Sequence, residues 1–183
     1  MSDSTTTGPH PESAQRPLGE FSRIVVGVDG SASSIDALRE AERLAEAFGS
    51  RLDVVCAWSY PISNYGMVPP DWYPDRDAAR TVHDVADTVF GETRPEWVHT
   101  SIREGAPARV LITESDTADL VVTGSRGHGG FAGLLLGSVS SEIAAHAHSP
   151  VLIVHPRPET KTRTRTETGS RALHEGQSGG AAR

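Results

Sequence analysis

The sequence predicts an α/β protein built on a single open, five-stranded parallel sheet with helices on both faces. Short apolar runs alternate along the chain with longer amphipathic segments, which indicates a β-α-β-α-β-α-β-α-β order. The apolar runs are unbroken rather than alternating with polar residues, as expected for strands that are buried on both faces. Parallel strands joined through helices require right-handed crossovers, and these place helices on both sides of the sheet.

The first half of the chain supplies two strands and one clear helix. A strand is predicted at 24–28, where an apolar run ends in Asp-Gly-Ser. An amphipathic helix follows with an apolar stripe from Ile35 to Phe48, serines at its start and a glycine after its end. A second strand is predicted at 53–58. The next segment, 59–75, is rich in proline and aromatic residues and is predicted to be a long loop.

The second half repeats the alternation of helices and strands. Pro107 suits the first turn of a helix, because a missing N–H costs nothing there. The predicted elements are a helix at 79–90, a strand at 98–102, a helix at 107–115, a strand at 120–123, a helix at 138–145 and a strand at 150–154.

Composition predicts one domain between two tails. Residues 1–20 are mostly Ser, Thr, Pro and acidic residues, and residues 157–183 are mostly Thr, Arg, Gly and Ser. Neither segment has enough apolar surface to offset the entropy of ordering, so both are predicted to be disordered around a domain at 21–156. No apolar stretch has the length of a signal peptide or a membrane span, so a cytoplasmic protein that does not bind membranes is expected.

Charge and cysteine content argue against several classes of ligand and site. The 183-residue chain has a net charge of −7, and its C-terminal tail is basic, so the folded part is strongly acidic. An acidic surface repels a phosphate backbone, which argues against specific nucleic-acid binding. The single cysteine, Cys56, lies in an apolar run and is predicted to be a buried thiol, with no disulfide and no cysteine-based metal site.

A glycine-rich stretch at 124–138 is the most informative segment of the chain. It joins an apolar run to a helical pattern, so its backbone N–H groups and the helix N-terminus are available to an anion. Two common phosphate motifs do not fit. A dinucleotide fingerprint belongs after the first strand, and a P-loop needs a lysine, whereas the only lysine is Lys161 in the tail.

Two strand ends carry unusual residues, namely Asp29-Gly30-Ser31 after the first strand and the glycine-rich stretch after the fourth. In open α/β sheets, ligands bind at the carboxyl ends of strands where the strand order reverses. A strand order of 3-2-1-4-5 places these two ends side by side. The sequence therefore predicts a binding site at this switch point.

The spacing Gly-x2-Gly-x9-Gly-Ser is formed by Gly124, Gly127, Gly137 and Ser138. With Val-Gly-Val-Asp-Gly-Ser at the first strand and Val-Leu-Ile-Val-His-Pro at the last, it resembles the nucleotide-binding branch of the universal stress protein family. The resemblance covers about residues 23–155. It implies a 3-2-1-4-5 sheet that binds ATP, together with Mg²⁺, at the switch point.

The same resemblance implies a role for each matching residue. Gly27 and Val28 would line the base, and Ala57 would meet its edge through the backbone. Asp29 would lie near the ribose and contact Mg²⁺ indirectly, through the phosphates. Backbone N–H groups around the phosphates would come from Gly124, Gly127, Gly129, Gly130, Gly137, Ser138, Val139 and Ser140.

Simpler interpretations of the same residues stay open. Asp29 is also placed to cap the first helix, Ser138 to be an N-cap, and Gly124 to end a strand. Arg126 and His128 either supply positive charge to phosphates or lie exposed. Three aromatic residues either close over an adenine or fill the edge of the sheet: Trp58, Tyr60 and Tyr65.

The expected function is that of a nucleotide-dependent regulatory module in the stress response, rather than an enzyme, because no hydrolytic centre is recognisable. A slow Mg²⁺-dependent ATPase or autophosphorylating protein and a dimeric adaptor without nucleotide are the alternatives. Glycine spacing alone does not distinguish ATP from AMP or a cyclic nucleotide. The resemblance also implies a homodimer through the last strand, at Val151, Leu152, Ile153 and Val154.

Overall fold

The computed structural model describes residues 21–60, 71–128 and 135–156, in which strands and helices alternate. The predicted tails lie outside the described residues. The strands are β1 (Arg23–Gly27), β2 (Arg51–Trp58), β3 (Val98–Glu104), β4 (Leu120–Gly124) and β5 (Val151–Val154). The helices are α1 (Ala32–Phe48), α2 (Pro74–Phe90), α3 (Pro107–Glu114) and α4 (Ser138–His146).

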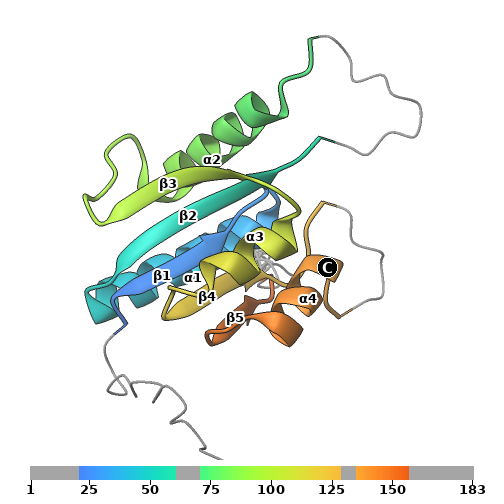
Figure 1. Ribbon diagram of the computed structural model, residues 1–183. Coiled ribbons are helices and arrows are strands. Elements are labelled where there is room, and N and C mark those ends of the chain that lie inside the picture. The colour runs from blue at the N-terminus through green and yellow to red at the C-terminus, as the bar shows by residue number, and fades with distance from the viewer. Residues whose placement is uncertain (1–20, 61–70, 129–134, 157–183) are drawn as a thin grey trace, which may run out of the picture.

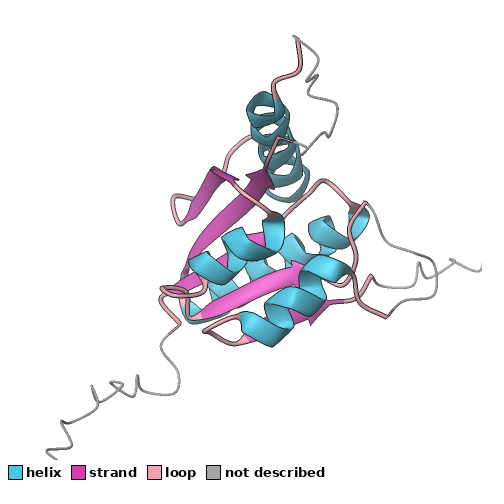
Figure 2. Ribbon diagram, turned by 45° about the vertical axis from the view of Figure 1, so that its right-hand side comes forward, coloured by secondary structure: helices cyan, strands magenta, loops and turns pink. Residues whose placement is uncertain are grey.

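The strands form one parallel sheet in the order β3-β2-β1-β4-β5, which confirms the predicted fold class. β1 lies at the centre, with Ile24 in register with Leu52 of β2 and Leu120 of β4. Helices α1 and α2 cover one face of the sheet, and α3 and α4 cover the other (Figure 1). The three layers are also visible after rotation in Figure 2. The sheet therefore has two buried faces.

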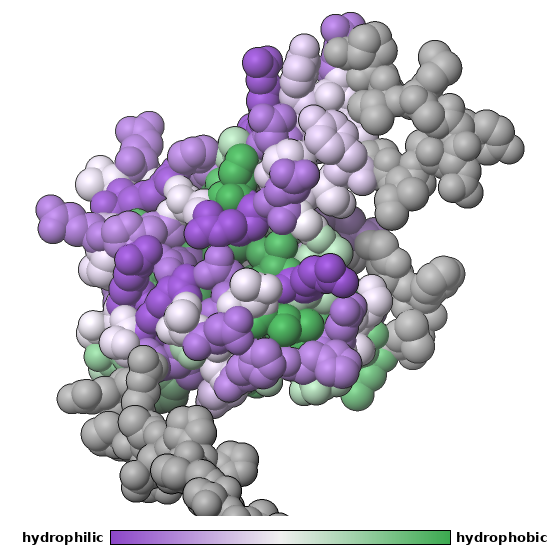
Figure 3. Space-filling view, in the orientation of Figure 1, coloured by the Kyte–Doolittle hydropathy of each residue, from purple (hydrophilic) through white to green (hydrophobic). Residues whose placement is uncertain are grey.

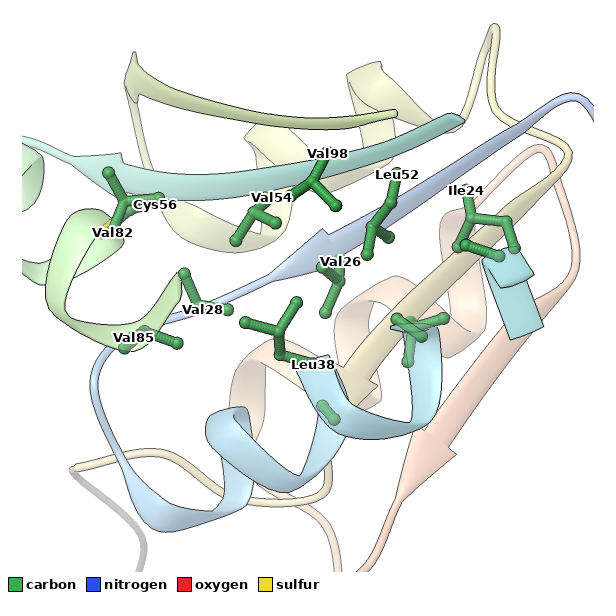
Figure 4. Packing of buried hydrophobic residues seen from close by; sticks show 14 of the residues in the cluster. Ile24, Val26, Val28, Leu38, Leu52, Val54, Cys56, Val82, Val85 and Val98 are labelled. Atoms are coloured by element: carbon green, nitrogen blue, oxygen red, sulfur yellow. The ribbon is translucent and has the colours of Figure 1, made fainter. Parts of the chain in front are cut away.

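Each central strand contributes to two hydrophobic cores. In β1, the side chains of Ile24 and Val26 pack beneath α1 and α2, whereas Val25 packs beneath α3 and α4. All three side chains are fully buried. Figure 4 shows the larger core, in which Leu38 of α1 and Val82 of α2 lie over the sheet. Burial on both sides explains why these strands are uninterrupted apolar runs.

The ends of the helices show why some boundaries were predictable. The side chain of Ser31 accepts a hydrogen bond from the Ser34 N–H at the start of α1, and Gly49 ends that helix with φ 65°. Helix α2 begins at Pro74, so the predicted start near Ala79 and the extension of the loop to Asp75 are wrong. Proline fits the first turn of a helix, and the aromatic and proline-rich sequence before it obscured this start.

Strand β2 begins at Arg51 and strand β3 ends at Glu104, so both extend beyond the predicted runs into charged residues. Arg23 Nε donates to Asp53 Oδ2 at 2.7 Å, and Arg51 Nε donates to Asp53 Oδ1 at 2.7 Å. Arg23 also reaches Glu114 Oε2 of α3 at 2.5 Å. Arg51 and Arg103 can occupy these strand positions since each one meets an opposite charge, and Arg103 Nε donates to Glu114 Oε1 at 2.9 Å.

Polar side chains dominate the face of the molecule seen in Figure 3, and apolar side chains gather only in small patches. Among the described residues, no helix has the length and apolar character needed to cross a membrane. The thiol of Cys56 is buried, as predicted, and burial raises its pKa to about 11.

Candidate functional site

A cavity of about 420 Å³ opens at the carboxyl ends of β1 and β4, where the strand order reverses. The structure brings to its wall every predicted contact residue that it describes: Gly27, Val28, Asp29, Ala57, Gly124, Gly127, Gly137, Ser138, Val139 and Ser140. Gly129 and Gly130 lie outside the described residues. The contacts of all these residues with a ligand stay predictions.

Several wall residues were not singled out by sequence analysis: Ser34, Val55, Pro107, Leu111 and Thr123. Val55 lies two residues before Ala57 on the same face of β2, so the period of a strand is a signal that points to it. In the sequence, Leu111 occupies an ordinary core position of a predicted helix. Only the packing of α3 on the sheet brings it to the cavity wall. Arg126 and His128 also line the cavity, and both side chains are exposed.

Three helices, α1, α3 and α4, begin at this cavity, and the N-termini of α1 and α4 differ. Helix α1 is capped by Ser31, whose N–H and hydroxyl donate to Asp29 Oδ1 at 3.0 and 2.6 Å. The interpretation of Asp29 as the helix cap is therefore wrong: the N-cap is Ser31, and Asp29 holds Ser31 in place. Helix α4 has Gly137 at its N-cap, with no side-chain cap and no acidic residue in its first turn. The prediction that Ser138 is the N-cap is wrong, because Ser138 is the first helical residue.

The start of α4 leaves backbone donors available. The first helical hydrogen bond there runs from the Ser141 N–H to the Gly137 oxygen at 3.0 Å. The N–H groups of the first turn, at Ser138, Val139 and Ser140, have no partner within a helix and carry the positive end of its dipole. The Gly137 N–H is bonded to the Ser125 oxygen at 2.7 Å, which fixes the helix start against the end of β4.

The presence of glycine at each position of the site has a different physical reason. A Cβ atom at Gly124 would lie 2.8 Å from the backbone carbon and oxygen of Ser33, so this glycine permits β4 to approach α1. A Cβ atom at Gly137 would meet nothing closer than 3.5 Å. Gly124 ends β4, in agreement with its simpler interpretation, and is also required by packing, whereas protein packing does not explain Gly137.

Asp29 is the acidic side chain on the cavity wall. Burial opposes its ionisation, but hydrogen bonds from Ser31 and the hydroxyl of Ser34, together with nearby His128, outweigh this and lower the pKa of the carboxyl group. Its Oδ2 atom accepts the His128 N–H at 3.3 Å and lies 3.5 Å from His128 Nδ1. Asp29 is thus ionised at neutral pH and contacts the glycine-rich loop.

The opposite end of the cavity is apolar and includes an exposed stretch of strand backbone. The Val28 N–H donates to the Val55 oxygen at 2.9 Å, where β1 ends, but β2 continues to Trp58. Alternate residues of a strand face the same neighbour, so the backbone of Ala57 faces the space beyond β1. The side chain of Leu111 borders this recess. The recess therefore suits a flat molecule that is apolar on its faces and polar at its edge.

The loop aromatics do not close this recess among the described residues. Trp58 packs against the hydrophobic core and contacts Tyr60 edge-on, with ring centroids 5.6 Å apart. Neither residue lines the cavity, so filling the edge of the sheet is the correct interpretation for Trp58. Tyr65 lies outside the described residues. Within the described ranges, no group of three His, Cys, Asp or Glu side chains could hold a metal ion by itself.

Solved structures share this fold. A crystal structure of a universal stress protein in complex with cAMP is 31% identical, covers 75% of this chain and 99% of its own, and has a TM-score of 0.55. A universal stress protein from Archaeoglobus fulgidus in complex with dAMP is 23% identical, with a TM-score of 0.52 over 73% of this chain and 98% of its own. At that identity, the second likeness shows the fold alone.

Sequence relatives agree with the structural ones. A universal stress protein of Mycolicibacterium smegmatis is 36% identical over 137 residues, which is 73% of this chain and 46% of that protein. One from Mycobacterium tuberculosis is 36% identical over 150 residues, which is 79% of this chain and 48% of that protein. The chain spans about half the length of these two relatives. A third relative, from Methanocaldococcus jannaschii, is 30% identical over 73% of this chain and 82% of its own length.

The family model for the universal stress protein family matches residues 20–155, nearly all of the chain that lies between the two tails. The glycine spacing and the strand order had implied the same relationship. The chain belongs to the universal stress protein family.

Proposed function

We propose that the cavity binds ATP together with Mg²⁺ and that nucleotide occupancy regulates a stress response in the cytoplasm. The observation that carries the proposal is the start of α4, which lines the cavity and has neither a side-chain cap nor an acidic residue in its first turn. The relative described in complex with cAMP supports an adenine nucleotide as the ligand class.

The energetics favour a charged phosphate group at this helix start. A backbone N–H that binds a charged acceptor contributes about 1.5–3 kcal/mol. The helix dipole adds an effective charge of roughly +0.5 at the same place. Gly127, Gly129 and Gly130 would supply further N–H groups from the loop, and Gly124 and Gly137 would frame the cradle.

The base would occupy the apolar recess at the other end of the cavity. Gly27 and Val28 would lie against its face, and the backbone of Ala57 would meet its polar edge. Asp29 would lie between the base and the phosphates and would contact the metal ion that the nucleotide brings. Because Asp29 is the acidic residue on the described wall, with no second acid beside it, the site favours binding over hydrolysis.

We also propose a homodimer formed through β5. This strand lies at one edge of the sheet, and each of its residues, from Val151 to Val154, is partly exposed. An apolar edge strand offers unpaired backbone groups to another strand, and a second copy of the chain would cover it.

Nucleotide binding is tested directly with the purified protein. The protein is denatured and the supernatant is separated by chromatography to identify any co-purified nucleotide. The ligand-free protein is then titrated with ATP, ADP and AMP, with and without Mg²⁺, and its melting temperature is recorded. We expect ATP with Mg²⁺ to bind and to raise the melting temperature.

The variant Gly127→Val introduces bulk where a Cβ atom would meet Asp29 Oδ2, so we expect it to abolish binding. Ala47→Val is the matched control, because Ala47 is exposed near the end of α1 and does not line the cavity. If the wild type binds no nucleotide and gains no thermal stability, the proposal is wrong and a dimeric adaptor without nucleotide takes its place.

A further inference from the structure

Thr123 brings a hydroxyl group into an otherwise apolar row on the floor of the cavity. The parallel pairing of the strands sets Val55 of β2, Gly27 of β1 and Thr123 of β4 side by side. Side chains alternate along a strand, so Thr123 shares the face of Val121, which α3 and α4 cover (Figure 1). All three residues of the row line the cavity.

The protein itself leaves this hydroxyl poorly paired. Thr123 is only 6% exposed, and among the described residues its hydroxyl has one partner, the Gly124 oxygen at 3.4 Å. Good O–H···O hydrogen bonds are about 2.5–3.0 Å long. The other buried hydroxyl groups on the described wall are better paired, since Ser34 donates to the Ser31 oxygen at 2.9 Å and Ser140 to the Ser125 oxygen at 3.0 Å. Because a buried hydroxyl without a good partner is unfavourable, Thr123 is suited to bind a ligand.

The position of Thr123 decides which part of a ligand it meets. Helix α3 packs on β1 and β2, and α4 packs on β5, so β4 lies between the two helices. A Cβ atom at Gly27 would overlap Leu111 Cδ1, so the apolar recess for the base begins beside Thr123, over β1. The start of α4, proposed for the phosphates, lies on the other side. Thr123 therefore lies below the part of a nucleotide where base and sugar join.

We propose that Thr123 is a specificity-determining residue whose hydroxyl binds the nucleoside part of the ligand at this junction. The polar atoms there are the sugar hydroxyl groups and the purine ring nitrogen N3, and a threonine hydroxyl can bind either kind, since it donates and accepts. The inference rests on the proposed function and adds a contact that senses the nucleoside. An anion without a nucleoside, such as inorganic triphosphate, fits the start of α4 but does not reach Thr123.

The first test uses the ligand-free protein and measures its melting temperature. Thr123→Val keeps the branched shape and replaces the hydroxyl by a methyl group. Since the hydroxyl has no good partner in the protein, we expect Thr123→Val to melt at or above the temperature of the wild type. Thr113→Val makes the same chemical change at an exposed position of α3 that does not line the cavity, and it is the matched control. If Thr123→Val melts below both the wild type and this control, the hydroxyl is paired within the protein and the inference is wrong.

The second test measures affinity by calorimetry. We expect Thr123→Val to bind ATP about three- to tenfold more weakly than the wild type, because one hydrogen bond to the ligand is lost. Thr113→Val should bind ATP like the wild type, and Thr123→Ser, which keeps the hydroxyl, should retain most of the affinity. Inorganic triphosphate should bind equally to the wild type and Thr123→Val.

Nucleotide analogues identify the partner atom. The titrations are repeated with 2′-deoxy-ATP, 3′-deoxy-ATP and 3-deaza-ATP, each of which lacks one candidate atom. The analogue without the partner atom should bind equally to the wild type and Thr123→Val, whereas the other two should keep the difference. Equal affinity of both proteins for ATP, or the same loss with all three analogues, overturns the inference and leaves the proposed function intact. Absence of ATP binding by the folded wild type overturns both.

Discussion

Gly124 and Gly137 belong to one sequence motif but serve different purposes. At Gly124 the backbone of Ser33 leaves no space for a side chain, so this glycine contributes to folding before any ligand binds. At Gly137 the backbone has φ −76° and ψ 166°, which any residue adopts, and a Cβ atom would have room. The motif therefore combines a packing requirement with a candidate binding requirement.

Substitution by alanine should separate these two requirements. We expect Gly124→Ala to lower the free energy of unfolding by about 1–3 kcal/mol, because the added methyl group forces β4 away from α1. Gly137→Ala should change it by only a few tenths of a kcal/mol, because alanine caps a helix less well than glycine but loses less chain entropy on folding, and it should mainly weaken nucleotide binding. Urea denaturation and calorimetry measure the two effects. Equal stability of Gly124→Ala and the wild type would show that the close approach is not required.

Asp29 should make part of the stability depend on pH. Its pKa is lowered below the ordinary 3.8 in the folded protein, so its contacts stabilise the fold above that value and are lost as the pH falls through the folded-state pKa. The difference in unfolding free energy between the wild type and Asp29→Asn should be constant near neutral pH and shrink below about pH 4. Because 45% of the side chain is exposed, the difference should be small. Urea titrations across this range measure it, and a difference that grows in acid contradicts the assignment.

At the scale of elements, the start of α4 gives up stability that a cap would supply. An acidic residue in the first turn of a helix stabilises it by about 0.3–1 kcal/mol. The first turns of α1, α3 and α4 have none, whereas that of α2 contains Asp75 and Asp77. Helix α4 differs from α1 in having no side-chain cap, and from α3 in having an N–H at its first residue, where α3 has Pro107. These two differences suit a helix start that binds an anion from outside the chain.

Ser138→Asp should therefore have opposite effects on stability and binding. Ser138 is exposed at the first position of α4, so we expect the new carboxylate to raise the free energy of unfolding by about 0.3–1 kcal/mol. The same charge should weaken ATP binding by about tenfold or more, through repulsion of the phosphates. Ser138→Asn, without charge, is the control. Tighter ATP binding by Ser138→Asp would place the phosphates elsewhere.

The elements also show what a sequence can predict. Unbroken apolar runs predicted the inner strands, because burial on two faces leaves no room for polar residues, whereas β3 at the edge of the sheet is polar and was predicted from a weaker pattern. The sequence analysis missed the start of α2 at Pro74 and the N-cap at Gly137. The first residue of a helix depends on the path of the preceding chain as well as on the residue type. Leu111 was missed for a related reason, because only the packing of α3 brings it to the cavity.

At the scale of the whole molecule, the strand order decides where the site lies. The order β3-β2-β1-β4-β5 sets the ends of β1 and β4 side by side, although they are far apart in the sequence. Glycine spacing predicted that Gly124, Gly127 and Gly137 line the cavity, because a backbone that must lie near a ligand or another segment restricts its residues to glycine. The apolar side needs ordinary core residues, such as Val55, and these carry no such signal.

The proposed dimer is tested at the edge of the sheet. Ile153 lies on β5 and belongs to neither hydrophobic core among the described residues, so a charge there should leave the monomer folded. We expect Ile153→Lys to convert the dimer to a monomer in light scattering, because the lysine would be buried without a partner at the interface. Circular dichroism checks that the variant is folded. A folded variant that is still dimeric would place the interface elsewhere.

The continuation of β2 beyond β1 has a consequence for aggregation. A stretch of strand without a neighbour is normally a hazard, because another chain can add to it. At Ala57 this stretch lies inside the sheet, between β3 and the cavity, rather than at its rim. An incoming strand cannot reach such a notch. The fold thus keeps a feature that usually invites self-association away from other chains.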